Sequence, residues 1–366
     1  MNITIVGAGN SGSAHAGMFA MDGHKVTIYE FIPNDNFRQL CKHPIIRVTY
    51  KDETCDPLLH RVTDDPSEAF EDAEIIFILT RTIAHPILAE KITPYLKDGQ
   101  LVVIAPGYGG SLLFASKTAG KDIIYAEGES IPFDCRLQSP GHVDICFKNI
   151  RNPMGFYPAN RSKEGLSRLK QLLDTYCLRK NIMESALSNP NLVVHTVGAL
   201  MGLARIEHSH GDYWMYRESF TPSIMNLLYA LDKERMDVLA KMNLPEMSFL
   251  DGFCYRTYED QSVDSEIAFR NYAECGSPKG PDSAETRYLT EDVPIGLCLL
   301  STLGKKFGLA MPVCDGIISI ASAVAKCDYW QEARTIEKLG LADMSVVEIL
   351  LGLKDGLDHY KGNAEL

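Results

Sequence analysis

The first half of the chain alternates short apolar runs with segments of helical periodicity. Apolar runs typical of a parallel sheet covered on both faces occur at residues 2–6, 25–30, 74–80, 100–106 and 122–128. Helices are expected over SAHAGMFAMDGH and from residue 162 to about 179, and two further strand-like stretches cover 142–149 and 152–159. This order predicts an α/β domain of the Rossmann type, built on a doubly wound, mostly parallel sheet.

From about Asn189 the apolar residues recur at intervals of three and four, which is typical of helices. Asn189 followed by Pro190 is a helix start, so we expect a dinucleotide-binding domain over residues 1–187 and an all-α, substrate-binding domain over 188–366. The segment 250–283 is expected to be the least regular part of the second domain. Its further helices are expected at 221–242, 291–307, about 311–338 and about 344–353.

Composition narrows the class of protein. A chain of 366 residues with 45% apolar content is expected to form two domains. The net charge of -12 argues against a nucleic acid or an anionic membrane as partner. Ten scattered cysteines without a C-x-x-C pair indicate reduced thiols, and neither a membrane span nor a signal peptide is expected. We therefore expect a soluble, cytoplasmic protein that acts on small molecules, with a homodimer as one option for its assembly.

The segment GAGNSG joins the first strand to the first helix and carries the G-x-G-x-x-G spacing of dinucleotide-binding turns. The first glycine permits the tight turn, the second lets the backbone approach a pyrophosphate, and the third allows close packing of strand and helix. The helix N-terminus supplies N–H groups to the phosphates. The residues expected to bind the cofactor here are Gly7, Gly9, Asn10, Ser11, Gly12 and Glu30.

Glu30 lies at the end of the second strand and could accept both ribose hydroxyls, which favours NAD. Arg38, eight residues on, leaves NADP open. Because ligands of such sheets bind beyond the carboxyl ends of the strands, the cleft walls are expected at residues 80–82 and in the loop PGYGG, 106–110. These segments contribute Thr80, Arg81, Pro106 and Gly107 to the predicted cofactor site, although PGYGG could also be a plain turn.

Two polar features of the second half are candidates for chemistry. His195 is the only titratable group among apolar neighbours in its helix, where Gly198 and Gly202 allow close packing, but a lone histidine is more often a core residue. In RYLTED, Thr290 is the expected N-cap, so that Arg287 precedes the helix and Asp292 lies in its first turn. Arg287 could then grip a carboxylate and Asp292 could orient a histidine, although capping acids and a surface arginine explain the pattern equally well.

The chain resembles the octopine/nopaline (opine) dehydrogenase family over nearly its whole length. The matching stretches are GAGNSG, YLKDGQLVVIAPGYGG, AEGESIPFDCR, NPNLVVH with ARIE after it, YRESFTPSIMNLLYALDKERM and RYLTEDVPIGL. The resemblance implies a Rossmann domain followed by an all-helical domain. It also implies an enzyme that uses NADH or NADPH to join the amine of an amino acid reductively to a 2-oxo acid.

The resemblance also implies roles for three residues. His195 would be the acid/base, Asp292 its partner, and Arg287 the ligand of a substrate carboxylate. Thr196 stands where the family usually has proline. Tyr108 occupies a loop position that is a polar amide in some members, so we expect it to contact the oxo acid and to affect its identity.

The segment HSHGDYWMY offers Tyr213 and Trp214 as lining for the amino-acid pocket, with ordinary packing as the alternative. Its H-x-H-x-D pattern is not expected to bind metal. Two other functions stay open. A dehydrogenase of glycerol phosphate or of a small keto or hydroxy acid would need a catalytic lysine in a K-x-x-N pair, which the helices do not offer. A non-enzymatic NAD-binding protein would not need His195, Arg287 and Asp292 to converge.

Overall fold

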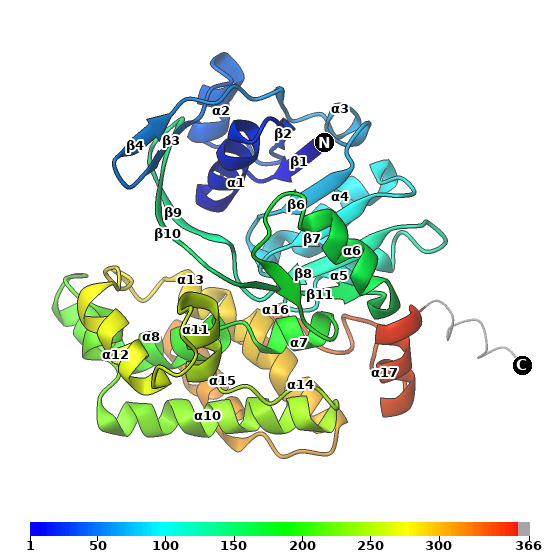
Figure 1. The fold of residues 1–366 in the computed structure, drawn as a ribbon. Helices are drawn as coiled ribbons and strands as arrows, with labels where there is room; N and C mark the ends of the chain where they lie inside the picture. Colours follow the sequence, from blue (N-terminus) through cyan, green and yellow to red (C-terminus); the bar gives the residue numbers. More distant parts are fainter. Residues whose placement is uncertain (358–366) are drawn as a thin grey trace, which may run out of the picture. The chain divides into compact units, whose positions relative to one another are not determined.

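A computed structural model describes residues 1–357 of the protein (Figure 1). The described residues form two compact units, one from Met1 to Ile182 together with the segment from Gly352 onward, and one from Met183 to Leu351. The division lies slightly before the boundary expected at residue 188, because α7 (Ile182–Leu187) falls almost entirely in the second unit. The expected second domain also included the residues from Gly352 onward, of which 358–366 lie outside the described residues.

The main sheet of the first unit has eight strands in the order β12-β11-β8-β7-β6-β1-β2-β5. All neighbouring strands are parallel except β8 and β11, which confirms the predicted doubly wound, mostly parallel sheet. The chain builds outward from β1 in both directions, so β1 and β6 flank the switch point where ligands of such sheets bind. The strands are β1 (Asn2–Val6), β2 (Lys25–Tyr29), β5 (Arg61–Thr63), β6 (Ile75–Ile78), β7 (Leu101–Ile104), β8 (Ile124–Gly128), β11 (Asn152–Tyr157) and β12 (Tyr176–Leu178).

Helices connect these strands. They are α1 (Asn10–Met21), α2 (Asp35–Lys42), α3 (Pro66–Phe70), α4 (His85–Ile92), α5 (Ser111–Ala115) and α6 (Ser162–Leu169), with short 3-10 turns η1 (Thr82–Ala84), η2 (Thr93–Tyr95) and η3 (Ala159–Arg161). The helix expected over 162–179 was too long. It ends at Leu169, and the buried Tyr176 then begins the edge strand β12, which pairs with β11.

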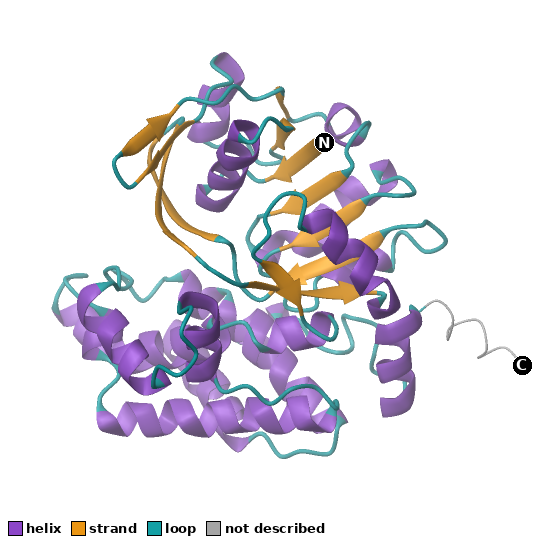
Figure 2. Ribbon diagram, in the orientation of Figure 1, coloured by secondary structure: helices purple, strands orange, loops and turns teal. Residues whose placement is uncertain are grey.

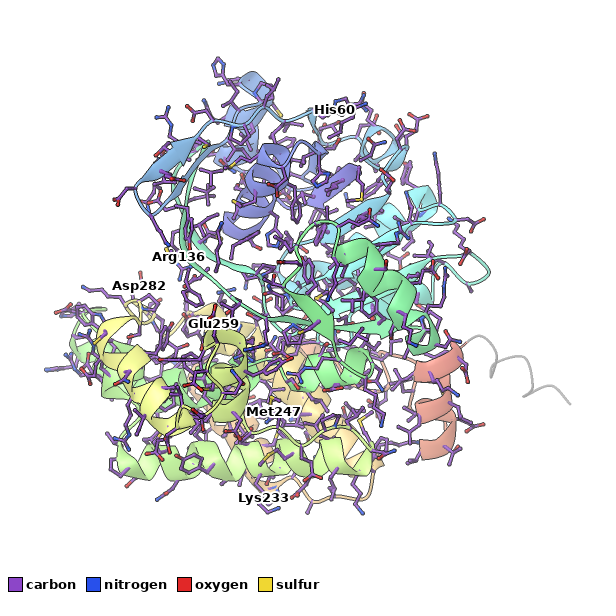
Figure 3. The ribbon with its side chains drawn as sticks, in the orientation of Figure 1. His60, Arg136, Lys233, Met247, Glu259 and Asp282 are labelled. Atoms are coloured by element: carbon purple, nitrogen blue, oxygen red, sulfur yellow. The ribbon has the colours of Figure 1, made fainter. Side chains whose placement is uncertain are left out.

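A second sheet of four strands, in the order β4-β3-β10-β9, covers α1 (Figures 1 and 2). Its strands are β3 (Arg47–Tyr50), β4 (Glu53–Cys55), β9 (Phe133–Ser139) and β10 (His142–Lys148). Gly17 of α1 permits this contact, because a side chain there would collide with Val48 of β3. Arg136, labelled in Figure 3, lies on β9 and pairs with Asp134.

The second unit is helical in its described residues (Figure 2). Besides α7 it contains α8 (Asn191–His208), α9 (Met215–Glu218), α10 (Pro222–Lys241), α11 (Phe249–Thr257), α12 (Ser265–Cys275), α13 (Arg287–Thr290), the π-helical turn η4 (Asp292–Leu297), α14 (Cys298–Lys306), α15 (Pro312–Ala325), α16 (Tyr329–Glu332) and the start of α17 (Val346–Asp355). The all-helical character predicted for this part of the chain is therefore confirmed. Lys233, labelled in Figure 3, lies on α10, where it forms a surface ion pair with Asp237.

Two expectations for the helical unit were wrong. The segment 250–283 contains two regular helices, α11 and α12, because Ser248 and Asp264 accept backbone N–H groups of their first turns. The single helix expected over 311–338 ends at Ala325, where Lys326 adopts a left-handed conformation with φ of 53°, and the short α16 follows. Capping residues, which apolar periodicity does not register, decide both outcomes.

All ten cysteines lie among the described residues, and none of them forms a disulfide. Burial raises the pKa of Cys135 and of Cys298 to about 12, so both are protonated near neutral pH and behave as small apolar residues. Among the described residues, no helix has the length and apolar content that crossing a membrane requires.

Candidate active site

His195 and Asp292 form a buried pair in the helical unit. His195 is the fifth residue of α8, and 6% of its surface is exposed. Its Nδ1 lies 2.9 Å from Oδ2 of Asp292, a residue 97 positions later in the chain. Because a carboxylate only accepts hydrogen bonds, Nδ1 is the donor, and Nε2 is the ring nitrogen left for other chemistry. No hydrogen bond to Nε2 is found within residues 1–357.

The structure changes the expected geometry of RYLTED. Thr290 is not an N-cap but the last residue of the short helix α13. Thr286 caps this helix, because its hydroxyl accepts the Tyr288 N–H at 3.3 Å, and Arg287 is its first residue. Asp292 begins a π-helical turn rather than a regular α-helix. The turn contains Pro294, which has no N–H to donate, and the Pro294 carbonyl accepts the Arg334 N–H at 3.0 Å. Such π turns are frequent at functional sites.

Burial lowers the pKa of His195 below its ordinary value of 6.5. The hydrogen bond and the charge of Asp292 act in the opposite direction, the charge of Arg287 lowers this pKa further, and that of Glu291 raises it. The net lowering leaves the imidazole neutral at pH 7, with a lone pair on Nε2. In this state His195 is equipped to take a proton, and Asp292 stabilises the imidazolium that results.

Tyr288 stacks on the imidazole of His195. The two ring centroids are 3.6 Å apart and the ring planes are inclined by 10°. No role was predicted for Tyr288, although it lies between Arg287 and Asp292 in the same motif. The available signal was its position in that motif, because periodicity cannot show which residues of a four-residue helix face a distant histidine.

Arg287 lies beside the pair and is exposed. Its guanidinium carbon is 5.9 Å from the centre of the Tyr288 ring, and its charge acts on His195. No ion pair of Arg287 is found in the part of the chain that the structure describes. Asp292 therefore bonds the His195 imidazole directly, while Arg287 acts on it through its charge.

Tyr213 does not lie at an open surface, contrary to its predicted place in an amino-acid pocket. Its side chain is 0% exposed, and its hydroxyl donates to the Gly198 carbonyl at 3.2 Å and hydrogen-bonds Ser219. A side chain at Gly202 would collide with this hydroxyl, so Tyr213 fills the space that the glycines of α8 leave. Trp214 is half-buried, and the cations of Lys279 and Arg217 lie 4.7 and 5.7 Å from its ring centre.

The glycine-rich turn of the first unit fits a dinucleotide. Gly7 has a φ of 111°, and a side chain there would come within 2.9 Å of the Leu79 carbonyl oxygen. A side chain at Gly12 would collide with the Gly7 carbonyl, which is the close approach of strand and helix that this motif provides. A Cβ at Gly9 would meet nothing within 4 Å, so the space beside it is open to a ligand.

Two further predicted cofactor residues follow β6, across the switch point from this turn. The hydroxyl of Thr80 is buried and has no hydrogen-bond partner among the described residues, while Arg81 is exposed. Of the residues at the start of α1, Asn10 accepts the Leu137 N–H at 2.9 Å, which ties the turn to β9. The backbone carbonyl of Ser11 bonds the ring of His15 at 2.7 Å.

Glu30 lies directly beyond β2, with 7% of its surface exposed. Its carboxylate accepts the N–H of Ala8, within the glycine-rich turn, at 2.9 Å, and that of Ile32 at 3.2 Å. Arg38, the candidate for binding a 2'-phosphate, pairs with Asp35 at 2.7 Å. The anionic group at the end of β2 is therefore held close to the turn, while the nearby cation already has an anionic partner.

The loop PGYGG is organised by a buried carboxylate that the sequence did not single out. Glu127 of β8 is 0% exposed and accepts the N–H of Gly109 at 2.9 Å, the N–H of Ser111 at 2.7 Å and the hydroxyl of Ser111 at 2.6 Å. A side chain at Gly107 would collide with this carboxylate. Tyr108 has a φ of 51° and is 1% exposed, so its ring is not at an open surface. Pro106 begins the loop, shortly after β7 ends at Ile104.

Known protein families match both parts of the chain. The family description "NAD/NADP octopine/nopaline dehydrogenase, alpha-helical domain" matches residues 178–325, and "NAD-dependent glycerol-3-phosphate dehydrogenase N-terminus" matches residues 2–109. An opine dehydrogenase of Arthrobacter sp. is 30% identical, with 94% of this chain and 96% of that protein covered.

Two solved structures share the fold. Octopine dehydrogenase with NADH and L-arginine superimposes with a TM-score of 0.78, and the same enzyme with NADH and pyruvate with a TM-score of 0.75. Both are 18% identical, and both comparisons cover 96% of this chain and 98% of the other.

The fold and the glycine-rich turn are together those of an NAD(P)-dependent oxidoreductase with a Rossmann domain and a helical domain. The chain belongs to the opine dehydrogenase family, and its activity is that of an oxidoreductase acting on CH–NH groups. The matched helical domain sets it apart from the glycerol-phosphate dehydrogenases, whose family description covers the first domain alone.

Proposed function

We propose that the protein condenses the amine of an L-amino acid with the carbonyl carbon of a pyruvate-like 2-oxo acid and reduces the product to an N-(carboxyalkyl)amino acid. The observation that carries the proposal is the buried His195–Asp292 pair with Arg287 beside it. A non-enzymatic NAD-binding protein would have no use for an imidazole held by a carboxylate, with its second nitrogen left for a ligand.

The chemistry assigns each residue a step. The neutral amine attacks the carbonyl carbon, and the adduct becomes a carbinolamine. Nε2 of His195, after taking up a proton from the substrate or solvent, donates it to the carbinolamine hydroxyl, which leaves as water and gives a protonated imine. The bound dinucleotide supplies the hydride that reduces this imine. In the reverse direction, Nε2 takes the proton of the secondary amine. Asp292 keeps the proton on Nδ1 and stabilises the imidazolium.

Arg287 is proposed to hold the carboxylate of the oxo acid. Replacing it with lysine keeps the charge but loses the two-pronged geometry, so we expect Arg287→Lys to raise the KM for the oxo acid by about tenfold or more. The KM for NADH should change little. Steady-state kinetics with the oxo acid varied at saturating amine and NADH measures this. Arg270→Lys, which alters an exposed arginine paired with Glu266, is the matched control. An unchanged oxo-acid KM in Arg287→Lys would exclude this role.

NAD is the proposed cofactor in preference to NADP. The Glu30 carboxylate would repel a 2'-phosphate and can accept ribose hydroxyls, while Arg38 pairs with Asp35. We expect kcat/KM to favour NADH over NADPH by at least about tenfold, and Glu30→Gln to narrow that ratio, because the amide keeps an acceptor for the Ala8 N–H without the charge. Glu53→Gln, on the exposed strand β4, is the control. A preference for NADPH in the unaltered protein would contradict the assignment.

The reaction is tested by following NADH oxidation across a grid of amino acids and 2-oxo acids. We expect oxidation that requires both substrates and fails with either one alone. Oxidation by the oxo acid without any amino acid would instead indicate a simple carbonyl reductase.

A further inference from the structure

Two contacts of different kinds hold the imidazole of His195. The hydrogen bond from Nδ1 to Asp292 lies in the ring plane, while the Tyr288 ring covers one face at a centroid distance of 3.6 Å. The first contact selects the tautomer. The second limits rotation of the ring out of its plane, which a single hydrogen bond does not prevent.

We propose that Tyr288 is a positioning residue, which holds the plane of the His195 ring and stabilises its protonated form as Nε2 exchanges protons with the substrate. The proposal rests on the proposed function and adds to it a residue that acts through His195.

The geometry of the stack suits a charged imidazole. Neutral aromatic pairs prefer offset or edge-to-face arrangements, with ring centroids roughly 4.5 to 7 Å apart. The Tyr288 and His195 rings lie closer than this and nearly parallel. A cation over the negative face of an aromatic ring is attracted to it, so this arrangement becomes favourable when His195 is protonated.

One short segment supplies both contacts. Thr286 caps α13 and accepts the N–H of Tyr288, and the buried Leu289 anchors the helix. The chain then enters the π-helical turn with Asp292 at its first position. Tyr288 of α13 and Asp292 of the turn are only four residues apart, so one short segment contacts both the face and the edge of the imidazole.

The charged groups that act on His195 are Asp292, Arg287 and Glu291, all from this segment. Asp292 and Glu291 favour the imidazolium, while Arg287 and burial oppose it. The Tyr288 ring adds an attraction that a leucine of similar apolar character cannot supply. Removing the ring should therefore make the imidazolium harder to form at a given pH.

The test compares Tyr288→Phe with Tyr288→Leu, and Tyr229→Leu serves as the control because Tyr229 lies on α10 at the surface. We expect Tyr288→Phe to keep kcat within about twofold, because the ring remains. Tyr288→Leu should lower kcat by about tenfold to 10²-fold, with the pH profile of kcat shifted to lower pH and the KM for NADH unchanged. A normal kcat and pH profile in Tyr288→Leu would overturn the proposal. Equal losses in both variants would do the same, since they would implicate the hydroxyl.

A second measurement does not depend on turnover or on the folding of the leucine variant. Proton NMR of the unaltered protein and of Tyr288→Phe should show the carbon-bound ring protons of His195 shifted upfield by the stacked ring, relative to those of the exposed His208. Unshifted His195 protons in both proteins would exclude the stack. A protein with the shifted signals but with no condensation of any amino acid would refute the proposed function and leave the stack intact.

Discussion

Replacing His195 with alanine is expected to lower turnover by about 10²- to 10⁴-fold, the range that general acid–base catalysis supplies. The reason is that Nε2 is the only ring position available to exchange protons with the substrate once Nδ1 is bound to Asp292. NADH binding should stay largely intact, because the glycine-rich turn that fits the dinucleotide belongs to the other unit. Steady-state kcat and a separate NADH titration by fluorescence measure the two effects.

His208→Ala is the matched control for this variant. His208 is the last residue of the same helix, α8, and it is exposed, so its loss should leave kcat unchanged. Near-normal turnover in His195→Ala would remove His195 from the chemistry. A parallel loss of NADH affinity would indicate that the substitution had perturbed the fold beyond the site, and that the lost activity does not report on a proton transfer.

Replacing Asp292 with asparagine is expected to lower kcat by about 10²-fold or more, because the amide can present an N–H to Nδ1 and favour the wrong tautomer. The pH dependence should change as well. Asp292 raises the pKa of His195, so removing its charge lets that pKa fall further. The basic form of the imidazole then persists to lower pH. For oxidation of the condensed product, the acid limb of the kcat/KM profile should therefore move to lower pH.

The control for Asp292→Asn is Asp237→Asn, which removes a carboxylate from a surface ion pair with Lys233 on α10. It should change neither kcat nor the pH profile, because exposed ion pairs contribute little. An acid limb at the same pH in Asp292→Asn and in the unaltered protein would show that the carboxylate does not act on His195.

Much of the fold follows from local pattern. The buried strands β6 and β7 are uninterrupted apolar runs, and α10 carries apolar residues at helical spacing, so these elements were predictable from periodicity. The strands β3 and β4 were not, because they are short, β4 is exposed, and they are held by the pairing of β3 with β10 and with β4. Pairing between distant segments leaves no periodic trace in either one.

The candidate site likewise has features that were expected from the sequence and features that were not. The proximity of His195 and Asp292 was expected from the family resemblance and from the chemistry of an imidazole and a carboxylate, not from spacing. The π-helical turn, the Thr286 cap and the stacked Tyr288 were not expected, since each depends on local backbone geometry that apolar periodicity does not specify. Glu127 was missed because a carboxylate inside an apolar strand gives no sign of the loop N–H groups it will accept.

We expect the protein to reduce a carbon–nitrogen double bond that it forms from two substrates. The most direct test uses NADH that carries deuterium at the transferable position of its nicotinamide, with an amino acid and pyruvate together. Mass spectrometry of the products should find an N-(carboxyethyl)amino acid with one deuterium on the carbon that was the pyruvate carbonyl. Deuterium found in lactate instead, with the amino acid recovered unchanged, would contradict the account.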